Sequence, residues 1–200
     1  MAGGPGHPAA PWRMHGHGWV SLFRVRGTRV RPDGTYVAGF VSYEPPSPLT
    51  YSELLVARVL DPRQVEITDI WVDSVASRDG GRTLWAIPKD LCDFSLEHRH
   101  TGVVSRASWS ARAEHPIAAA SFTDASRLAP RLPFRGLGTR QPPLPDDTGE
   151  PVVAGLRGSA RLLPCRGSWD FEPTGPLGWL GDQHRLASFR VADFRILFGV

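Results

Sequence analysis

Glycine and proline divide this chain into many short apolar runs, and no run has the sustained periodicity of an amphipathic helix. The 21 glycines and 19 prolines fall between segments rich in valine, isoleucine, phenylalanine and tryptophan. This punctuation is typical of strand-rich proteins. Many strands in one domain must close or stack. We therefore predict a mainly β (α+β) fold, an antiparallel β-barrel-like domain with one or two short helices.

Turn residues place two hairpins in the first half of the chain. Residues 18–25 and 35–43 are predicted strands joined across Arg31-Pro32-Asp33-Gly34, and residues 54–60 and 65–74 form the second pair. Apolar and polar residues alternate at the start of the last strand, as expected when one face is buried. The other predicted strands are residues 94–98, 102–113, 116–122, 152–163 and 187–198.

One short segment favours a helix, and one long segment favours irregular structure. Residues 77–81 are predicted to be a turn that leads into a helix over residues 82–87. Pro88 ends this helix because its ring disfavours helical backbone in the residue before it. Residues 131–151 hold many prolines and show no periodicity, so we predict a long connection or a lid.

Length and composition favour one domain that acts on a small molecule. We expect residues 1–10 to be a flexible tail and residues 11–200 to form a single domain, without a secretory signal or an apolar run able to cross a bilayer. Cys92 and Cys165 cannot form a disulfide framework, so a cytoplasmic location is expected. The net charge of +3 is mild and the arginines are scattered, which argues against nucleic-acid or membrane partners.

Lys89 is the only lysine in the chain, since arginine supplies all the other basic residues among the Lys+Arg total of 23. Both side chains provide surface charge, but only the lysine amine can lose its proton near neutral pH and attack a carbonyl carbon. A composition rich in arginine, alanine and glycine can also leave one lysine by chance. Lys89 is therefore a candidate nucleophile, and the residues around it decide its interpretation.

Four segments around Lys89 carry a family resemblance. Ile70-Trp71-Val72-Asp73 and then Gly81-Arg82-Thr83-Leu84-Trp85-Ala86-Ile87-Pro88-Lys89 are similar to a strand ending in an acid, followed by Gly-Arg-x-x-x-x-x-Pro-Lys. Tyr51-Ser52-Glu53 resembles a Tyr-x-Glu element. Pro11-Trp12-Arg13-Met14-His15 resembles the aromatic segment that opens the domain. This signature is that of the acetoacetate decarboxylase family, and the chain resembles a divergent member of it.

The resemblance implies a β-barrel-type domain that forms homo-oligomers and acts on a small-molecule carbonyl substrate. It implies that Lys89 is the catalytic residue that forms a Schiff base, and that Glu53 is a second catalytic residue that moves protons or positions the substrate. No cofactor and no metal are expected. The implied substrate-binding residues are Met14, His17, Tyr51, Trp71, Arg82 and Trp85.

The lysine must lose a proton before it can attack a carbonyl. An unperturbed lysine has a pKa of about 10.4, and lowering it to about 7 requires about 4 to 5 kcal/mol of destabilisation of the ammonium. We expect desolvation to supply this free energy. The apolar residues predicted to bury the amine are Trp71, Trp85, Ile87 and Leu91.

Three positions depart from the family pattern and favour a different substrate or reaction. Asp90 stands where the family has a second lysine, so its carboxylate must point away from Lys89 or desolvation must act alone. His17 aligns with an arginine that binds the substrate carboxylate, and Ala38 with a second pocket glutamate. The arginines that could take over this role are Arg13, Arg24 and Arg82.

We therefore predict a Schiff-base-forming lyase that performs decarboxylation, aldol, retro-aldol or dehydration chemistry on a keto acid or another carbonyl compound. The alternative is a non-catalytic β-barrel that binds an apolar small molecule or a partner and keeps Lys89 for structure. His15-Gly16-His17 and His98-Arg99-His100 have a spacing that metal sites use, but hydrogen-bonded or solvated histidines are the simpler interpretation.

Overall fold

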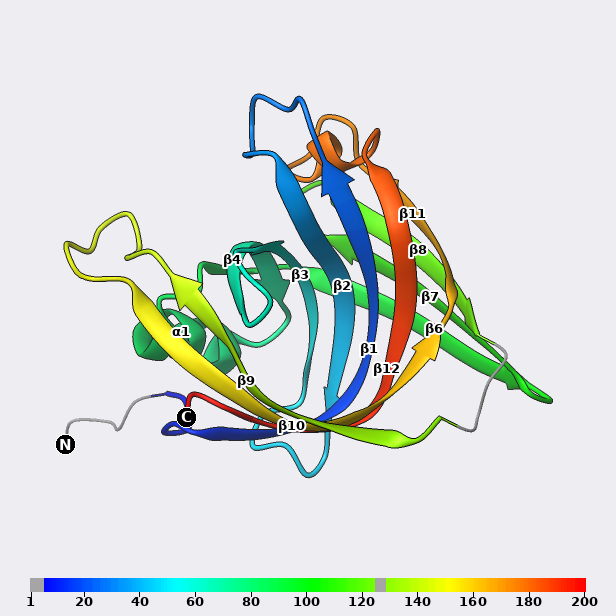
Figure 1. Cartoon of the computed structure of the whole chain (residues 1–200), viewed down its shortest axis with the longest axis horizontal. Coiled ribbons are helices and arrows are strands. Elements are labelled where there is room, and N and C mark those ends of the chain that lie inside the picture. The colour runs from blue at the N-terminus through cyan, green and yellow to red at the C-terminus, as the bar shows by residue number, and fades with distance from the viewer. Residues whose placement is uncertain (1–5, 125–128) are drawn as a thin grey trace.

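The computed structural model describes residues 6–124 and 129–200 (Figure 1). Within them one long helix and one short 3₁₀ helix accompany the strands. In chain order the elements are β1 (Trp12–Val25), β2 (Gly34–Glu44), β3 (Tyr51–Val59), β4 (Gln64–Val72), α1 (Val75–Trp85), β5 (Lys89–Leu91), β6 (Asp93–Thr101), β7 (Val104–Arg112), β8 (Pro116–Asp124), β9 (Arg131–Gln141), β10 (Val152–Pro164), β11 (Arg166–Phe171), η1 (Gly178–Leu180) and β12 (His184–Phe198).

The strands form an 8-stranded sheet in the order β3-β2-β1-β12-β10-β9-β4-β5 and a 4-stranded sheet in the order β11-β8-β7-β6. The larger sheet closes on itself because β4 also pairs with β3. The start of β4 pairs in parallel with β9, and its end pairs in parallel with β5. The predicted mainly β, barrel-like fold is confirmed, and the two parallel pairings are an addition to the antiparallel arrangement expected from the turns.

Two apolar cores fill the fold. The first lies against the smaller sheet, where aromatic rings such as Phe40 and Trp109 stack with centroids 5.2 Å apart. The second fills the barrel and includes Trp12 and Met14. β1 contributes to both cores, because Trp19 belongs to the first. The barrel core is the one that surrounds Lys89.

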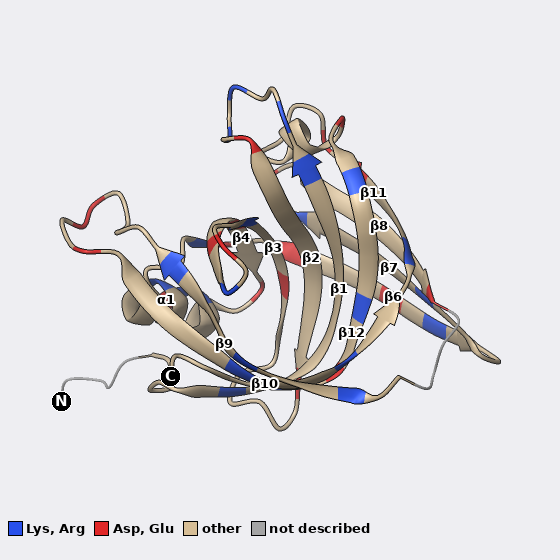
Figure 2. Cartoon of the chain, viewed as in Figure 1, with Lys and Arg blue, Asp and Glu red and all other residues tan. Residues whose placement is uncertain are grey.

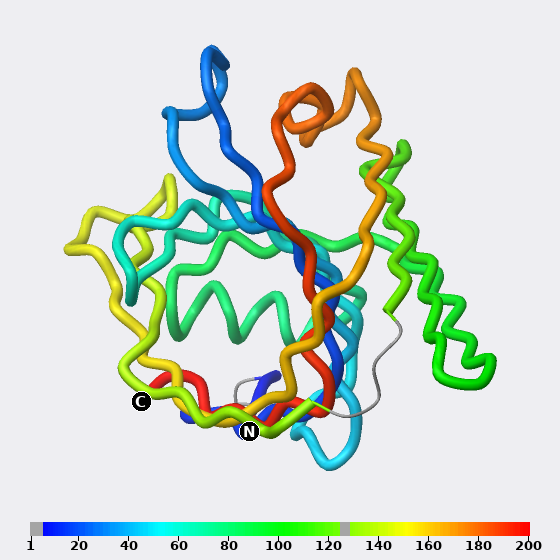
Figure 3. Tube along the Cα trace, turned by 45° about the vertical axis from the view of Figure 1, so that its right-hand side comes forward, coloured from blue at the N-terminus to red at the C-terminus, as the bar shows by residue number. Residues whose placement is uncertain are grey.

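α1 begins earlier than the sequence predicted. The helix starts after Ser74, whose hydroxyl accepts a hydrogen bond from the backbone N–H of Ser77, and it ends at Ala86, which has a left-handed backbone with φ of 52°. The predicted turn at residues 77–81 is wrong, because Gly80 and Gly81 lie inside the helix. Figure 3 shows α1 within the ring of strands.

The predicted connection over residues 131–151 is only partly irregular. Arg131–Gln141 forms β9, which pairs with β10 and with the start of β4. A Cβ atom at Gly138 would lie 2.5 Å from the backbone oxygen of Ala154, so the close approach of these strands requires glycine there. The strand β11 was also not predicted. The loop of residues 142–151 remains irregular.

Residues 1–5 of the predicted tail lie outside the described residues. The part that is described contacts the domain, because the indole of Trp12 donates a hydrogen bond to the backbone oxygen of Pro8. Charged residues are distributed over both sheets and their loops, as Figure 2 shows. No helix in residues 6–124 or 129–200 has the length and apolar character needed to span a bilayer.

Candidate active site

A cavity of about 190 Å³ lies inside the barrel, and the side chain of Lys89 reaches it. Its wall combines strands from both ends of the chain with the end of α1. Most of the lining is apolar. The lining residues are Trp12, Met14, Tyr43, Tyr51, Glu53, Leu55, Ala57, Val65, Ile67, Ile70, Trp85, Ile87, Lys89, Thr139, Leu156, Ile196 and Phe198.

The amine of Lys89 is held by three side-chain oxygens. Its Nζ lies 2.9 Å from Oε2 of Glu53, 3.0 Å from Oγ of Ser77 and 3.4 Å from the hydroxyl of Tyr51. Lys89 is 4% exposed and Glu53 is 3% exposed. This is a buried ion pair in which the ammonium donates to each partner.

Glu53 is held in turn by a second tyrosine. The hydroxyl of Tyr43 donates a hydrogen bond of 3.1 Å to Oε1 of Glu53, and the rings of Tyr43 and Tyr51 lie 4.4 Å apart. Burial raises the pKa of both phenols, and for Tyr43 the neighbouring Glu53 carboxylate raises the pKa further. Both hydroxyl groups therefore stay protonated at neutral pH and can donate to an oxygen.

The parallel pairing of β5 with β4 fixes the direction of the lysine side chain. Lys89 pairs with Ile70, and both side chains line the cavity. The side chain of Lys89 passes α1 at Gly81, which has no side chain to block it. A Cβ atom at Gly81 would lie 2.8 Å from Cδ of Lys89. Gly80 has the same role for Trp12, whose ring would be 2.6 Å from an added Cβ. The two glycines are therefore required by contacts rather than by a turn.

Asp90 points away from the amine, as alternation along a strand requires. Its side chain is 70% exposed, and Oδ1 lies 3.8 Å from Nη1 of Arg82. The same Arg82 guanidinium donates to the backbone oxygen of Lys89 at 3.2 Å. Arg82 thus braces the backbone that carries the lysine, while the Asp90 charge lies outside the cavity.

The pKa of Lys89 is raised from its ordinary value of 10.5. Burial alone lowers it, but the charge of Glu53 and the hydrogen bonds from Lys89 to Glu53 and Tyr51 outweigh this desolvation. The sequence-based expectation that desolvation lowers the lysine pKa did not include a carboxylate 2.9 Å away. The lysine is therefore an ammonium paired with the Glu53 carboxylate.

Five of the eight predicted site residues line one cavity, and three do not. Those that line it are Met14, Tyr51, Glu53, Trp85 and Lys89. Trp71 packs against the first core instead, because its strand neighbours Ile70 and Val72 face the barrel. Among the described residues, the guanidinium of Arg82 donates a hydrogen bond to the backbone oxygen of Lys89 and pairs with the carboxylate of Asp90, outside the cavity lining.

His17 also lies outside the cavity. Its Nδ1 accepts a hydrogen bond of 3.0 Å from the backbone N–H of Asp193, and its Nε2 lies 3.9 Å from Oε2 of Glu44. Burial lowers the pKa of the His17 imidazole. This histidine fastens β1 to the bulged part of β12 and takes no part in the cavity.

Three polar residues of the site were not found from the sequence. Ser77 hydrogen-bonds the amine from the start of α1, although residues 77–81 were predicted to be a turn before the helix. Tyr43 was placed at the end of a predicted strand without a role. Thr139 lines the cavity from β9, which was predicted to be a connection. Only Tyr43 left a local signal, since alternation along its strand directs it to one face.

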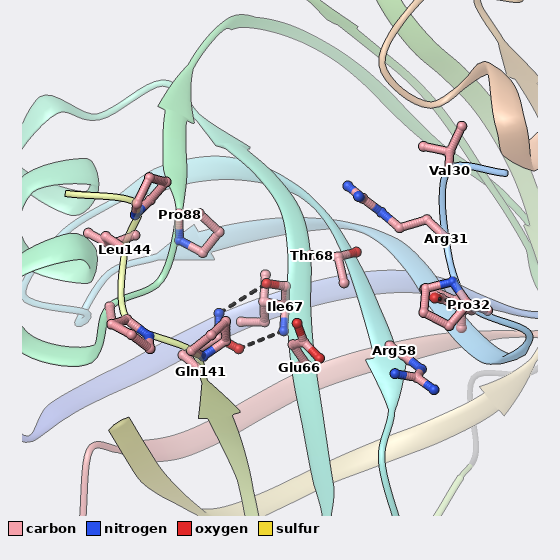
Figure 4. A pocket seen from close by; sticks show the side chains of 15 residues that line it. Val30, Arg31, Pro32, Arg58, Glu66, Ile67, Thr68, Pro88, Gln141 and Leu144 are labelled. Atoms are coloured by element: carbon pink, nitrogen blue, oxygen red, sulfur yellow. Dashed lines mark hydrogen bonds between the residues drawn. The ribbon is translucent and has the colours of Figure 1, made fainter. Parts of the chain in front are cut away.

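A second hollow of about 310 Å³ lies beside the cavity, and Ile67 lines both. Figure 4 shows it between the segment of Pro88, the loop after β9 and the turn of Arg31. Gln141 lies at this boundary, 1% exposed, and its side-chain amide makes two hydrogen bonds to the backbone of Ile67, at 2.7 and 3.0 Å. The start of β4 pairs with β9 and its end pairs with β5, and Ile67 lies between these two pairings. The side chain of Gln141 supplies the hydrogen bonds that a neighbouring strand would otherwise give to Ile67.

The histidine pairs do not assemble a metal centre in the part of the chain that the structure describes, where no group of three or more His, Cys, Asp or Glu side chains converges. The side chain of His98 lies 2.9 Å from the Ser105 hydroxyl, and its ring is 4.5 Å from that of His100. Burial and the charge of Arg190 lower the pKa of His98 to about 4. Its imidazole is therefore neutral at neutral pH.

Three solved structures share this architecture at low sequence identity. MppR, an enduracididine biosynthesis enzyme complexed with pyruvate, superposes with a TM-score of 0.70 at 15% identity over 96% of this chain and 90% of that one. Acetoacetate decarboxylase from Legionella pneumophila subsp. pneumophila str. Philadelphia 1 gives 0.65 at 14% identity, covering 98% and 90%. An acetoacetate decarboxylase-like enzyme from Sphingomonas wittichii RW1 gives 0.63 at 15%, covering 96% and 92%.

Comparisons with protein-family models and with curated proteins found no match. The structural likeness covers nearly the whole chain and confirms the fold that the resemblance implied. The chain has the acetoacetate decarboxylase-like fold, at 14 to 15% sequence identity to these three structures.

Proposed function

We propose that this protein is an enzyme that forms a Schiff base between Lys89 and a small carbonyl compound. The observation that carries the proposal is the ion pair itself: Nζ of Lys89 lies 2.9 Å from Glu53 at the wall of an apolar cavity. A lysine held only for structure needs a partner but does not need to line a cavity. Here the only amine side chain of the chain has both.

The raised pKa of Lys89 requires an explanation of how the neutral amine forms. A proton can pass from Nζ to Oε2 of Glu53 along their hydrogen bond, which converts two charges into two neutral groups. A substrate that fills the cavity excludes water and favours this neutral pair, because charges are costly in an apolar medium. The desolvation that opposes the ammonium then acts at the moment when the amine is needed.

The carbonyl addition conserves charge at the pair. The neutral amine adds to the carbonyl carbon, and the carbonyl oxygen takes up two protons and leaves as water. The products are a Lys89 iminium and a Glu53 carboxylate, so the pair begins and ends with one positive and one negative charge. Hydroxyl groups of Tyr51 and Ser77 lie within 3.4 Å of Nζ and can donate to the departing oxygen.

The structural neighbours support this chemistry as an analogy. MppR is described in complex with pyruvate and, separately, with the condensation product of pyruvate and imidazole 4-carboxaldehyde. Both descriptions concern carbonyl compounds on the same fold. Fold alone does not transmit function, so the proposal rests on the lysine and its cavity.

Borohydride trapping tests the proposal. Incubation with carbonyl compounds such as pyruvate, methyl pyruvate, butanone or imidazole 4-carboxaldehyde, followed by borohydride reduction, fixes any iminium as a stable secondary amine. Because Lys89 is the only lysine, peptide mass analysis has one internal site to find and separates it from the amino terminus. We expect a reduced adduct on the peptide that contains Lys89.

The matched control is Lys89→Arg, which keeps a positive charge beside Glu53 but offers no amine that can form an iminium. It should give no internal adduct. If the natural protein also gives none with any compound of the panel, while a fluorescent apolar ligand still binds to both proteins, the non-catalytic barrel is the correct alternative.

A further inference from the structure

We infer that the substrate is an uncharged, apolar aldehyde or ketone rather than a keto acid. This inference rests on the proposed function, because it names the class of carbonyl compound that reaches Lys89. The evidence is the charge balance of the cavity. Among the described residues that line it, Glu53 is the only anion and Lys89 is the only cation.

A keto acid would upset that balance. A neutral ketone leaves an iminium facing the Glu53 carboxylate, so the charges in the cavity still cancel. A keto acid would leave two carboxylates to share the Lys89 iminium, with one negative charge in excess inside an apolar space. A buried charge without a partner is strongly unfavourable, so the cavity selects against the carboxylate.

The arginines that could bind a carboxylate lie elsewhere. Arg13 is exposed, while its strand neighbours Trp12 and Met14 face the cavity. Arg24 is exposed at the far end of β1. Arg82 contacts the backbone of Lys89 and the carboxylate of Asp90, on the side away from the amine.

The walls of the cavity match an apolar substrate of limited size. Met14, Leu55, Ile70 and Phe198 come from four strands and surround the space in front of the amine. The volume of about 190 Å³ equals that of about six water molecules in the liquid. A short-chain or small cyclic carbonyl compound fits this volume, and its apolar part gains contact with the walls.

This substrate class restricts the reaction. Without a substrate carboxylate, no carbon dioxide can leave. The Lys89 iminium instead acidifies the neighbouring C–H, and the Glu53 carboxylate takes that proton to give a neutral enamine and a neutral carboxylic acid. The enamine carbon can then add to a second carbonyl carbon and form a carbon–carbon bond, which restores the Lys89 iminium. The new alkoxide oxygen takes the proton held by Glu53, so the pair again carries one positive and one negative charge. Water then adds to the iminium carbon and hydrolyses the Schiff base, which releases the product and the Lys89 amine.

Pairs in which a carboxylate is replaced by its uncharged methyl ester test the inference. Pyruvate is compared with methyl pyruvate, and acetoacetate with methyl acetoacetate, by borohydride trapping on the whole protein. Each Lys89 adduct yield is divided by the yield on N-acetyl-lysine methylamide under the same conditions, which removes the intrinsic reactivity of the carbonyl. We expect the uncharged member of each pair to react at least ten-fold better.

The outcomes separate the inference from the function on which it rests. Normalised yields that are equal, or higher for the acids, overturn the inference and leave the Schiff-base function intact. Release of carbon dioxide from acetoacetate faster than in the Lys89→Arg control also overturns it. The absence of any Lys89 adduct with every compound contradicts the proposed function itself.

Discussion

Nζ of Lys89 and Oε2 of Glu53 lie 2.9 Å apart although β5 and β3, which carry them, are not neighbours in the sheet. β4 lies between these strands and pairs with both, so one register places the amine and the carboxylate on the same side of the barrel. The pair is the centre of the candidate site, and its energetics can be measured separately from any reaction.

Replacing only the lysine should destabilise the fold strongly. Lys89→Met leaves the Glu53 carboxylate buried without its partner, and breaking one member of a buried pair costs about 3 to 5 kcal/mol of unfolding free energy. The double variant Lys89→Met with Glu53→Gln should recover most of this loss. Urea denaturation at pH 7 measures both. A double variant no more stable than the single one contradicts this account.

The exposed pair of Arg99 and Glu97 offers a comparison, because their side chains are 80% and 66% exposed. Arg99→Met should change the unfolding free energy by less than about 1 kcal/mol. A loss as large as that of Lys89→Met would show that burial is not the cause.

Stability should fall at alkaline pH. The pKa of Lys89 is raised above 10.5, so the folded state holds this proton more tightly than the unfolded chain does. Its contribution is complete below about pH 10.5 and is lost as the pH rises through the folded pKa. Tyr51, whose pKa burial raises above 10.0, acts in the same direction. Denaturation curves from pH 8 to 11.5 should show a steeper loss than in the Lys89→Met, Glu53→Gln double variant.

Gly81→Ala should impair the chemistry more than the fold. The added Cβ would lie 2.8 Å from Cδ of Lys89, so the flexible lysine chain must move and carry the amine with it. We expect the rate of iminium trapping to fall by about ten- to a hundred-fold. The unfolding free energy should change by about 1 kcal/mol or less, because alanine favours the helix. Gly149→Ala, whose Cβ would have no atom within 4 Å, should leave both unchanged.

Asp90→Asn should have little effect on trapping. The carboxylate is 70% exposed and directed toward Arg82, so water and ions screen its charge from the amine. We expect trapping rates within about two-fold of the natural protein at 0.15 M salt. A ten-fold change in either direction would mean that Asp90 acts on Lys89 in spite of its position.

Gln141→Leu should open the junction between β9 and β4. The substitution removes both hydrogen bonds to the backbone of Ile67, and each unsatisfied buried group costs about 1 to 3 kcal/mol. Hydrogen exchange at the Ile67 amide should become faster by at least ten-fold. Gln183→Leu is the control, since its side chain accepts one bond, from the backbone N–H of Arg26, at an exposed site.

The sequence predicted what local patterns and motif spacing can encode. Strand alternation and turns indicated a β-barrel-like domain, and the Pro-Lys motif with Tyr-x-Glu located Lys89, Tyr51 and Glu53. Alternation from Val65 and Ile67, which line the cavity, would place Trp71 inside the barrel as well. A bulge in β4 between Ile67 and Asp69 reverses the alternation, so Ile70 and Val72 face the barrel and Trp71 faces the other core.

The remaining errors concern residues whose roles depend on distant contacts. Gly80 and Gly81 indicated a turn, yet both lie in a helix. Glycine is needed there because Trp12 and Lys89 occupy the space where larger side chains would be. The prolines of residues 131–151 and the lack of periodicity also concealed β9, where Gly138 is opposite Gly155 and a Cβ atom would lie 2.5 Å from the backbone oxygen of Ala154. The upward direction of the lysine pKa required the 2.9 Å distance to Glu53, which no spacing along the chain reveals.

β12 pairs with β1 from Trp12 opposite Phe198 to Arg24 opposite His184. This ladder closes a loop of chain that contains every element from β2 to η1. During synthesis β1 can pair with β12 only after residues up to Phe198 have been made, while β6, β7 and β8 can pair as soon as they emerge. The barrel can therefore close only after β12 has been made, so the cavity around Lys89 forms later than the hairpins of the smaller sheet can.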